Sequence, residues 1–252
     1  GLGHGWPWDD VAASYSAPVS GLQFNENSAQ IVVIPGAIGA SPTIESKPSS
    51  ARLTIRNRAT TAVGGTPLRL RPEPRSTIIN VVGSVEPAQA PVTRTVSVVN
   101  PTVYFANAAR DALIENGIAI DDVAIDADDL PTLDRTQAFK LADITSAPLS
   151  TIATTMMQLS QNLFAESLLK TVGRVSSRRE GTTATGRDVV SEQLAAWGIG
   201  AQDVLMVDGS GLSRNNLVTP AAQTALLGRV YADARLRDPF LAALPVAGGQ
   251  GT

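Results

Sequence analysis

Alternating apolar and polar residues characterise the first hundred positions of this 252-residue chain. A period of two is typical of half-buried β-strands, and prolines between the runs keep such strands short. The pattern predicts strands at 52–57, 68–70, 78–83 and 92–99. Two further extended runs, 22–24 and 29–34, flank the polar segment 25–28, which predicts a β-hairpin at this point.

Helical spacing of apolar residues first appears after Asn100-Pro101, where Asn is a favoured cap and Pro is tolerated in the first turn. Gly117 is expected to end this helix, and 118–120 is expected to form a strand. Helical character predominates from about residue 141. The pattern predicts helices from Pro148, over 163–173, over 185–197 and from Thr219-Pro220 to about 231, with a short buried strand at 204–207. Separate strands and helices favour the α+β class over a regular βαβ series. We expect an inserted β-rich region at 1–140 and a helical part of a second domain at 141–252.

Composition narrows the partners of the chain. Apolar residues make up 43% of it, enough for a core, and a formal charge of −3 gives no reason to expect nucleic acid or an anionic membrane as a partner. No run of eighteen apolar residues occurs, so no transmembrane segment is expected. The β-rich region carries a group of arginines, which we interpret either as a solvated face or as a surface that holds an anionic glycan or stem peptide. These are Arg52, Arg56, Arg58, Arg69, Arg71 and Arg75.

Metal and cofactor sites are not indicated. The chain has no cysteine and a single histidine, His4, which excludes a thiol nucleophile and a multi-histidine cluster. Six aspartates lie within 121–134, but the Gly and Glu that an EF-hand loop needs are absent from the required positions. We therefore expect an acidic surface loop there and no metal or cofactor.

One polar triplet, Ser160-Gln161-Asn162, interrupts two helical patterns. Ser-x-Asn is one of three motifs that active-site serine penicillin-recognising enzymes combine, the others being Ser-x-x-Lys and Lys-Thr-Gly. The alternative is structural, because Ser160 or Asn162 could cap the helix that follows.

A second stretch, Asp208-Gly209-Ser210-Gly211-Leu212-Ser213-Arg214, makes the pattern more specific. Together with Ser160–Lys170, it resembles the D-alanyl-D-alanine carboxypeptidase/endopeptidase family of class C low-molecular-mass penicillin-binding proteins. Three shorter stretches resemble the same family in the same order, so the resemblance covers nearly the whole chain. They are Gly5-Trp6-Pro7-Trp8-Asp9-Asp10, Ser146-Ala147-Pro148-Leu149 and Leu244-Pro245-Val246-Ala247-Gly248.

The resemblance implies part of a penicillin-binding transpeptidase-like (serine β-lactamase-like) fold. It also implies a serine-type peptidase that cleaves peptidoglycan stem peptides ending in D-Ala-D-Ala through an acyl-enzyme, is acylated by β-lactam antibiotics and works outside the cytoplasmic membrane. Ser160 would shuttle a proton and the Asn162 amide would hold the substrate backbone, while Gln161 is a mild departure from the Asp found in many members. The second stretch would line the cleft through Asp208, Gly209, Ser210, Gly211 and Ser213.

The family's nucleophile is expected to lie outside these 252 residues. Ser-x-x-Lys occurs once, as Ser167-Leu168-Leu169-Lys170, and this match lies within the helix that follows the Ser-x-Asn triplet. We interpret it as a coincidence, because one segment would have to supply both halves of a cleft. No Lys-Thr-Gly occurs, so we expect the chain to be a portion of the enzyme that forms no acyl-enzyme by itself. Two alternatives stay open: a non-catalytic peptidoglycan-binding or scaffold protein, and a peptidase with Ser210 as its nucleophile.

Overall fold

A computed structural model describes residues 1–130, 132, 136, 139–140 and 142–248. The chain divides into two compact units. The first comprises Gly1–Leu2 and Asp9–Leu133, and the second comprises Gly3–Trp8 and Asp134–Thr252. The expected boundary at 140/141 stays a prediction, since residue 141 lies outside the described residues. The six residues Gly3–Trp8 group with the second unit although they stand at the start of the sequence.

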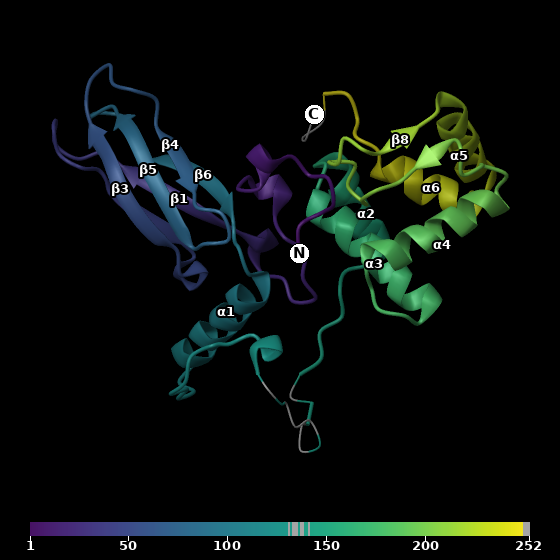
Figure 1. Ribbon diagram of the computed structural model, residues 1–252, viewed down its shortest axis with the longest axis horizontal. Coiled ribbons are helices and arrows are strands. Elements are labelled where there is room, and N and C mark those ends of the chain that lie inside the picture. Colours follow the sequence, from purple (N-terminus) through teal and green to yellow (C-terminus); the bar gives the residue numbers. More distant parts are fainter. Residues whose placement is uncertain (131, 133–135, 137–138, 141, 249–252) are drawn as a thin grey trace. The chain divides into compact units, whose positions relative to one another are not determined.

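The first unit contains two three-stranded sheets that share one core (Figure 1). Their orders are β2-β1-β6 and β3-β5-β4. The strands are β1 (Ser28–Ile34), β2 (Thr43–Lys47), β3 (Thr54–Thr61), β4 (Arg69–Pro72), β5 (Ile78–Val85) and β6 (Val92–Ser97). Strand β3 pairs with β5 in parallel, whereas all other pairs within these two sheets are antiparallel. The central strands supply most of the core, through Ile31 and Val33 of β1 and Ile79, Val81 and Val85 of β5.

The predicted hairpin of 22–24 with 29–34 is wrong. Strand β1 instead pairs with β2 and β6, and its register joins Val33 to Ile44 and to Val92. Asn25, Glu26 and Asn27 all have positive φ angles and form a 3-10 turn ahead of β1. Asn27 is buried and its amide donates to the Pro18 carbonyl oxygen at 2.9 Å, so this polar segment anchors the start of β1 without turning the chain back on residues 22–24.

Helix α1 (Pro101–Glu115) begins and ends as predicted. The Asn100 side chain accepts from the Val103 N–H at 3.2 Å, and Gly117 has a φ of 85° just beyond the last turn. The buried Tyr104 hydroxyl donates to the Ser28 carbonyl oxygen at 3.0 Å, which fixes α1 to the start of β1. Residues 118–120 form no strand; Arg110 instead donates to the Ile120 carbonyl oxygen.

The second unit contains five helices and a two-stranded sheet in its described part (Figure 1). The helices are α2 (Leu149–Gln158), α3 (Asn162–Ser177), α4 (Thr183–Ala196), α5 (Pro220–Ala232) and α6 (Ala234–Ala243). Helix α3 packs on α4, and α6 packs on both α2 and α5. The sheet pairs β7 (Val204–Leu205) with β8 (Leu217–Val218). The strand expected to be buried at 204–207 is thus shorter than predicted and half-exposed at Leu205. Helices and separate strands together confirm the α+β class.

Gly173 does not end its helix, contrary to the prediction, because α3 continues to Ser177. Its role is close packing. A Cβ atom on Gly173 would lie 2.6 Å from the Gly186 backbone nitrogen, and one on Gly186 would lie 2.2 Å from the Leu169 carbonyl oxygen. The two glycines therefore let the backbones of α3 and α4 approach more closely than any side chain would allow.

We expect Gly173→Ala to lower the free energy of unfolding by about 1–3 kcal/mol, because the added methyl forces α3 away from α4. Gly228→Ala in α5 is the matched control, since a Cβ there would meet no atom within 4 Å. That variant should gain roughly 0.5–1 kcal/mol from helix propensity. Chemical denaturation of both variants measures the difference, and an equal gain in both would contradict the packing argument.

The aspartate-rich segment forms an exposed loop with a short 3-10 turn at Ala127–Asp129, where Asp126 caps the turn by accepting from the Asp128 N–H. Asp134, the last aspartate of the segment, lies outside the described residues. Within the described ranges, no three His, Asp or Glu side chains are grouped as a metal ion would require. No helix within these ranges has the length and apolar character needed to span a bilayer.

Candidate functional site

Ser160 lies at the junction between α2 and α3, in a left-handed backbone conformation. Its φ is 52° and its side chain is exposed. The Gln161 N–H donates to the Met156 carbonyl oxygen at 2.9 Å, which is the long-range bond of a Schellman motif at the end of α2. Glycine is the residue that normally occupies the left-handed position of this motif, and serine there costs about 1 kcal/mol or more. The chain thus places a hydroxyl where local stability favours glycine.

Neither Ser160 nor Asn162 caps α3, so that alternative is wrong. The cap is Gln161, whose side-chain oxygen accepts from the Leu163 N–H at 3.2 Å. Asn162 is half-buried and forms the first residue of the helix. The middle residue of the triplet therefore caps α3. The two outer residues occupy the positions that the family resemblance assigns to catalysis.

Glu166 connects α3 to the second predicted stretch. Its carboxylate is 1% exposed, and a single oxygen accepts from the Gly209 N–H at 2.8 Å, the Ser210 N–H at 2.9 Å and the Ser210 hydroxyl at 2.9 Å. The contact is close because Gly209 has no side chain: a Cβ there would lie 2.8 Å from the Ala165 carbonyl oxygen. Glu166 lies one helical turn beyond Asn162, so the turn at 208–211 is fixed against the first half of α3.

Asp208 organises the same turn from within. It is 2% exposed, and its two oxygens accept from the Gly211 N–H at 2.9 Å, the Ser213 N–H at 2.7 Å and the Asn216 amide at 2.7 Å. The Trp6 indole N–H donates a fourth bond at 2.9 Å. Within the described residues neither Asp208 nor Glu166 has an ion-pair partner, so N–H and O–H donors alone compensate their burial.

All seven sequence-predicted site residues thus lie either at the start of α3 or in the turn that is bonded to α3. Ser160 and Asn162 flank the start of α3, while Asp208, Gly209, Ser210, Gly211 and Ser213 form the turn that Glu166 holds. Sequence reasoning gave no role to Glu166, Trp6 or Asn216. A signal was available for Glu166, since a carboxylate in the middle of an apolar helical stripe must find donors when it is buried.

The serine and the lysine of the single Ser-x-x-Lys match form hydrogen bonds to α3 and α4. The Ser167 hydroxyl donates to the Leu163 carbonyl oxygen at 2.7 Å, within the helix. The Lys170 ammonium donates to the Thr183 hydroxyl of α4 at 2.9 Å. Both residues therefore contribute to the packing of α3, and the interpretation of this match as a coincidence stays a prediction.

The bond between Trp6 and Asp208 gives a direct test of the turn. We expect Trp6→Phe to lower the free energy of unfolding by about 1.5–3 kcal/mol, because a donor to a buried carboxylate is removed. Trp8→Phe is the control, since Trp8 is 73% exposed, and such surface changes stay within roughly 0.5 kcal/mol. Thermal unfolding followed by circular dichroism compares the two, and equal losses would argue against a role for the indole bond.

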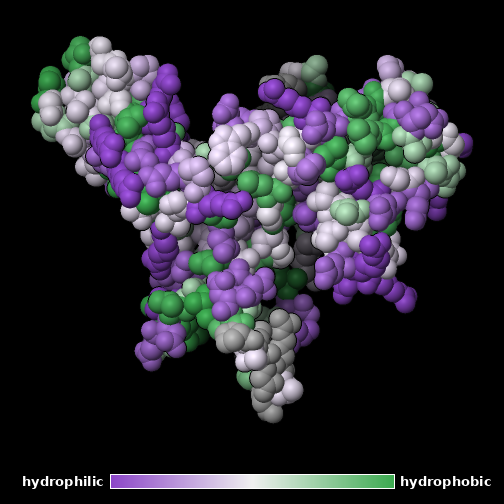
Figure 2. Space-filling view, viewed as in Figure 1, coloured by the Kyte–Doolittle hydropathy of each residue, from purple (hydrophilic) through white to green (hydrophobic). Residues whose placement is uncertain are grey.

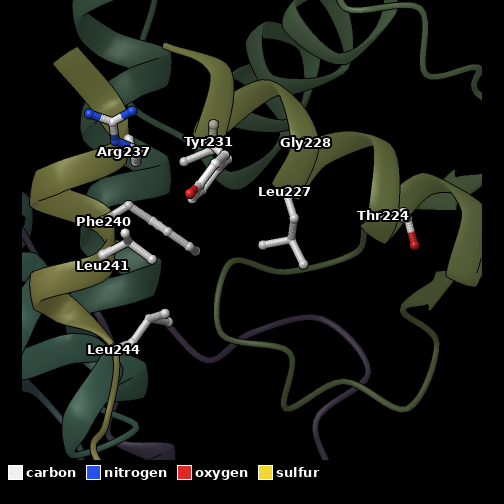
Figure 3. A pocket seen from close by; sticks show the side chains of 9 residues that line it. Thr224, Leu227, Gly228, Tyr231, Arg237, Phe240, Leu241 and Leu244 are labelled. Atoms are coloured by element: carbon white, nitrogen blue, oxygen red, sulfur yellow. The ribbon is translucent and has the colours of Figure 1, made fainter. Parts of the chain in front are cut away.

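An apolar groove of about 470 Å³ lies between α5 and α6 (Figure 3). Leu227 and Tyr231 of α5 face Phe240 and Leu241 of α6 across it. The Arg237 guanidinium lies 5.8 Å from the centre of the Tyr231 ring, which is a cation–π distance. None of the predicted site residues lines this groove.

Comparison with known proteins gives a consistent result. The model of the D-Ala-D-Ala carboxypeptidase 3 (S13) family matches residues 1–252. A D-alanyl-D-alanine carboxypeptidase of Actinomadura sp. (strain R39) is 34% identical over 253 residues, covering 96% of this chain and 46% of the relative. The penicillin-sensitive carboxypeptidase A of Dictyostelium discoideum is 28% identical over 260 residues, covering 98% of this chain and 48% of the relative.

Solved structures show the same fold. Penicillin binding protein 4 (dacB) of Haemophilus influenzae superposes with a TM-score of 0.79 at 24% identity, covering 100% of this chain and 55% of that one. Its complex with a novel β-lactam gives a TM-score of 0.74 at 23% identity, over 94% of this chain and 54% of that one. The chain spans about half the length of the relatives it matches.

Proposed function

This chain belongs to the D-Ala-D-Ala carboxypeptidase 3 (S13) family, and from this premise we propose that it forms part of a penicillin-sensitive serine peptidase. The enzyme is a D-Ala-D-Ala carboxypeptidase/endopeptidase that acts on peptidoglycan stem peptides through an acyl-enzyme. The names of the two relatives, a D-alanyl-D-alanine carboxypeptidase and a penicillin-sensitive carboxypeptidase, support this assignment.

The observation that carries the proposal is the attachment of the Asp208–Ser213 turn to α3 by Glu166. Two stretches that were singled out separately, and that lie more than forty residues apart, are joined by three hydrogen bonds to one buried oxygen. A peptidase cleft needs its proton-transfer group, its substrate anchor and its wall to keep fixed positions. The buried carboxylates supply that rigidity to this half of the cleft.

Ser160 is the proton-transfer residue. Hydrolysis of the terminal amide requires the nucleophilic hydroxyl to lose a proton and the departing D-Ala nitrogen to gain one. A serine hydroxyl can accept one proton while it donates another, so it can pass the proton between the two sites without a net change of charge. The strained, exposed backbone position of Ser160 supports this role, since such strain tends to persist where function requires it.

Asn162 positions the substrate. Its amide offers both donors and an acceptor, which matches the N–H and C=O groups of a peptide backbone. Because Gln161 caps the helix, Asn162 is not required for that task. The acyl group of the substrate is carried by a serine in another segment of the complete enzyme, and water then releases it as a carboxylate.

The Asp208–Ser213 turn shapes the cleft wall and supplies no nucleophile. The Ser210 hydroxyl donates to Glu166, and its own backbone N–H is bound to the same oxygen. A carboxylate beneath a serine can accept its proton, but here it also holds the backbone in place. This arrangement favours a structural role for Ser210 over the nucleophile alternative.

The partners follow from the reaction. The substrate is a peptidoglycan stem peptide that ends in D-Ala-D-Ala, and β-lactam antibiotics acylate the same nucleophile. The beta-lactam complex solved for penicillin binding protein 4 of Haemophilus influenzae supports the second statement. Since peptidoglycan lies outside the cytoplasmic membrane, the enzyme works in the periplasm or cell wall.

Labelling with a fluorescent penicillin tests the proposal. The polypeptide is isolated as the source cell makes it, its intact mass is compared with 26.2 kDa, and it is then exposed to the label. We expect a stoichiometric covalent adduct on a serine that is neither Ser160, Ser167 nor Ser210. Absence of any adduct would overturn the proposal and favour a non-catalytic wall-binding protein, while an adduct on Ser210 would overturn the role of the turn.

A further inference from the structure

Four arginines form a two-by-two array on the outer face of the β3-β5-β4 sheet. The register places Arg56 and Arg71 on either side of Asn80, and Arg58 and Arg69 on either side of Val82. Because side chains alternate along a strand, residues 56, 58, 69 and 71 share a face opposite to the core residues Ala59, Ile79 and Val81. All four arginines are exposed. Figure 2 shows a hydrophilic band over the strands labelled β3, β5 and β4 in Figure 1.

The array carries a local positive charge although the whole chain has a formal charge of −3. One carboxylate, that of Glu73, pairs with Arg56 at 2.6 Å. Within the described part of the chain, Arg58, Arg69 and Arg71 form no ion pair. Four like charges on the two strands that flank β5 repel one another, and such an arrangement is stabilised when anions bind between them.

The spacing fits several anions rather than one. Strand geometry separates the arginine Cα atoms by roughly 6.8 Å along each strand and by about 9.6 Å across the central strand. Each guanidinium presents a planar fork that binds one carboxylate through two hydrogen bonds. Long, flexible stems extend this reach, so the array can bind carboxylates that repeat along a polymer.

The rest of the face favours recognition by charge alone. Its other outward positions on β3 and β5 are Thr54, Thr60, Ile78, Asn80, Val82 and Ser84. None of them is aromatic, so the face offers no ring on which a nucleobase could stack. The four arginines therefore supply the charge of this face, and they select anionic groups of a ligand.

We propose that this arginine face, comprising Arg56, Arg58, Arg69 and Arg71, docks the carboxylates of stem peptides along a peptidoglycan strand. The choice of ligand rests on the proposed function, which makes this polymer the substrate. Each uncrosslinked stem peptide ends in a carboxylate, and these charges recur along the glycan. The face thus anchors the enzyme to the polymer at stems other than the one being cleaved.

Co-sedimentation of the 252-residue chain with purified insoluble peptidoglycan tests this inference. The polymer is first stripped of covalently attached phosphate polymers, so that carboxylates are its main anions. We expect the variant with Arg58→Gln, Arg69→Gln and Arg71→Gln to bind about tenfold more weakly than the wild type or worse, because three charge-assisted contacts are removed. The corresponding triple Lys variant should fall between the two, since it keeps the charge and loses the forks.

The matched control neutralises three exposed arginines that lie outside the first unit, Arg178→Gln, Arg179→Gln and Arg229→Gln. It should bind like the wild type, which separates the array from net charge. Amidation of the peptidoglycan carboxylates should abolish the difference between wild type and triple Gln variant. Equal binding of the wild type and the triple Gln variant to peptidoglycan that has not been amidated would overturn the inference. It would also be overturned if the wild type bound only to peptidoglycan that still carries its attached phosphate polymers.

The outcome of this sedimentation test is independent of the outcome of the penicillin-labelling test. Sedimentation needs no catalysis, and penicillin labelling of the complete enzyme should be unchanged in the triple Gln variant. Loss of peptidoglycan binding with intact labelling supports the arginine face. Normal binding by the triple Gln variant with intact labelling rejects the face and leaves the peptidase assignment in place.

Discussion

Replacement of Ser160 by glycine is expected to make the protein more stable and, in the complete enzyme, much slower to react with penicillin. Glycine removes the strain of a φ of 52° at the end of α2 and should raise the free energy of unfolding by about 1 kcal/mol. Loss of the hydroxyl removes the proposed proton-transfer group and should slow acylation by penicillin about 10²–10⁴-fold. The two effects are measured by chemical denaturation of this chain and by stopped-flow acylation of the complete enzyme.

Three companion variants separate the effects. Ser160→Ala should lose acylation to the same extent without gaining stability, because alanine keeps the unfavourable backbone conformation. Arg178→Gly, at another left-handed position with φ 58° at the end of α3, should gain stability and keep its acylation rate. Ser167→Ala should also acylate at the normal rate. An unchanged rate in Ser160→Ala would refute the role of Ser160, whereas loss of labelling in Ser167→Ala would show that the Ser-x-x-Lys match is functional.

Removal of the Glu166 side chain is expected to give the largest loss of stability in the chain. Glu166→Ala leaves the Gly209 and Ser210 N–H groups without an acceptor inside the protein and opens a cavity beneath the turn. Together these effects should cost about 3–5 kcal/mol. The free energy of unfolding of a domain is roughly 5–15 kcal/mol, so this loss would be a large fraction of it. Urea denaturation gives the value directly.

Glu166→Gln keeps an oxygen for the three donors and should cost clearly less than Glu166→Ala. Glu192→Ala, an exposed position of α4, is the surface control and should change stability by no more than roughly 0.5 kcal/mol. In the complete enzyme, Glu166→Gln should retain part of the acylation rate because the turn stays attached to α3. Similar stability of Glu166→Ala and Glu192→Ala would contradict the bridging role.

Local patterns predicted most elements of both units. Strands β3 to β6 and helices α1 to α5 lie within a few residues of the expected ranges, because each carries its own periodicity or cap. The wrong hairpin prediction involves a partner distant in sequence. The hairpin at 22–34 was wrong because β1 pairs with β6, more than fifty residues away, and the turn residues between the two runs can also serve as an anchor.

The residues of the candidate site were likewise predictable from the sequence only in part. The Ser-x-Asn triplet and the Asp208–Ser213 stretch were identified from residue types and from resemblance to a family. Which triplet residue caps the helix was not predictable, since serine, glutamine and asparagine all offer an oxygen. The structure assigns the cap to Gln161, and it assigns to Gly173 a packing role in place of the predicted helix end.

The sequence by itself determined the α+β class and the family, and it singled out the residues of the candidate site. These depend on local periodicity and on short motifs, which are encoded by neighbouring residues. Only the tertiary structure decided that Glu166 joins α3 to the turn, that Asp208 gathers four donors including Trp6, and that four arginines share one sheet face. The physical reason is that a buried carboxylate and a strand register are each defined by partners that folding brings together from distant parts of the chain.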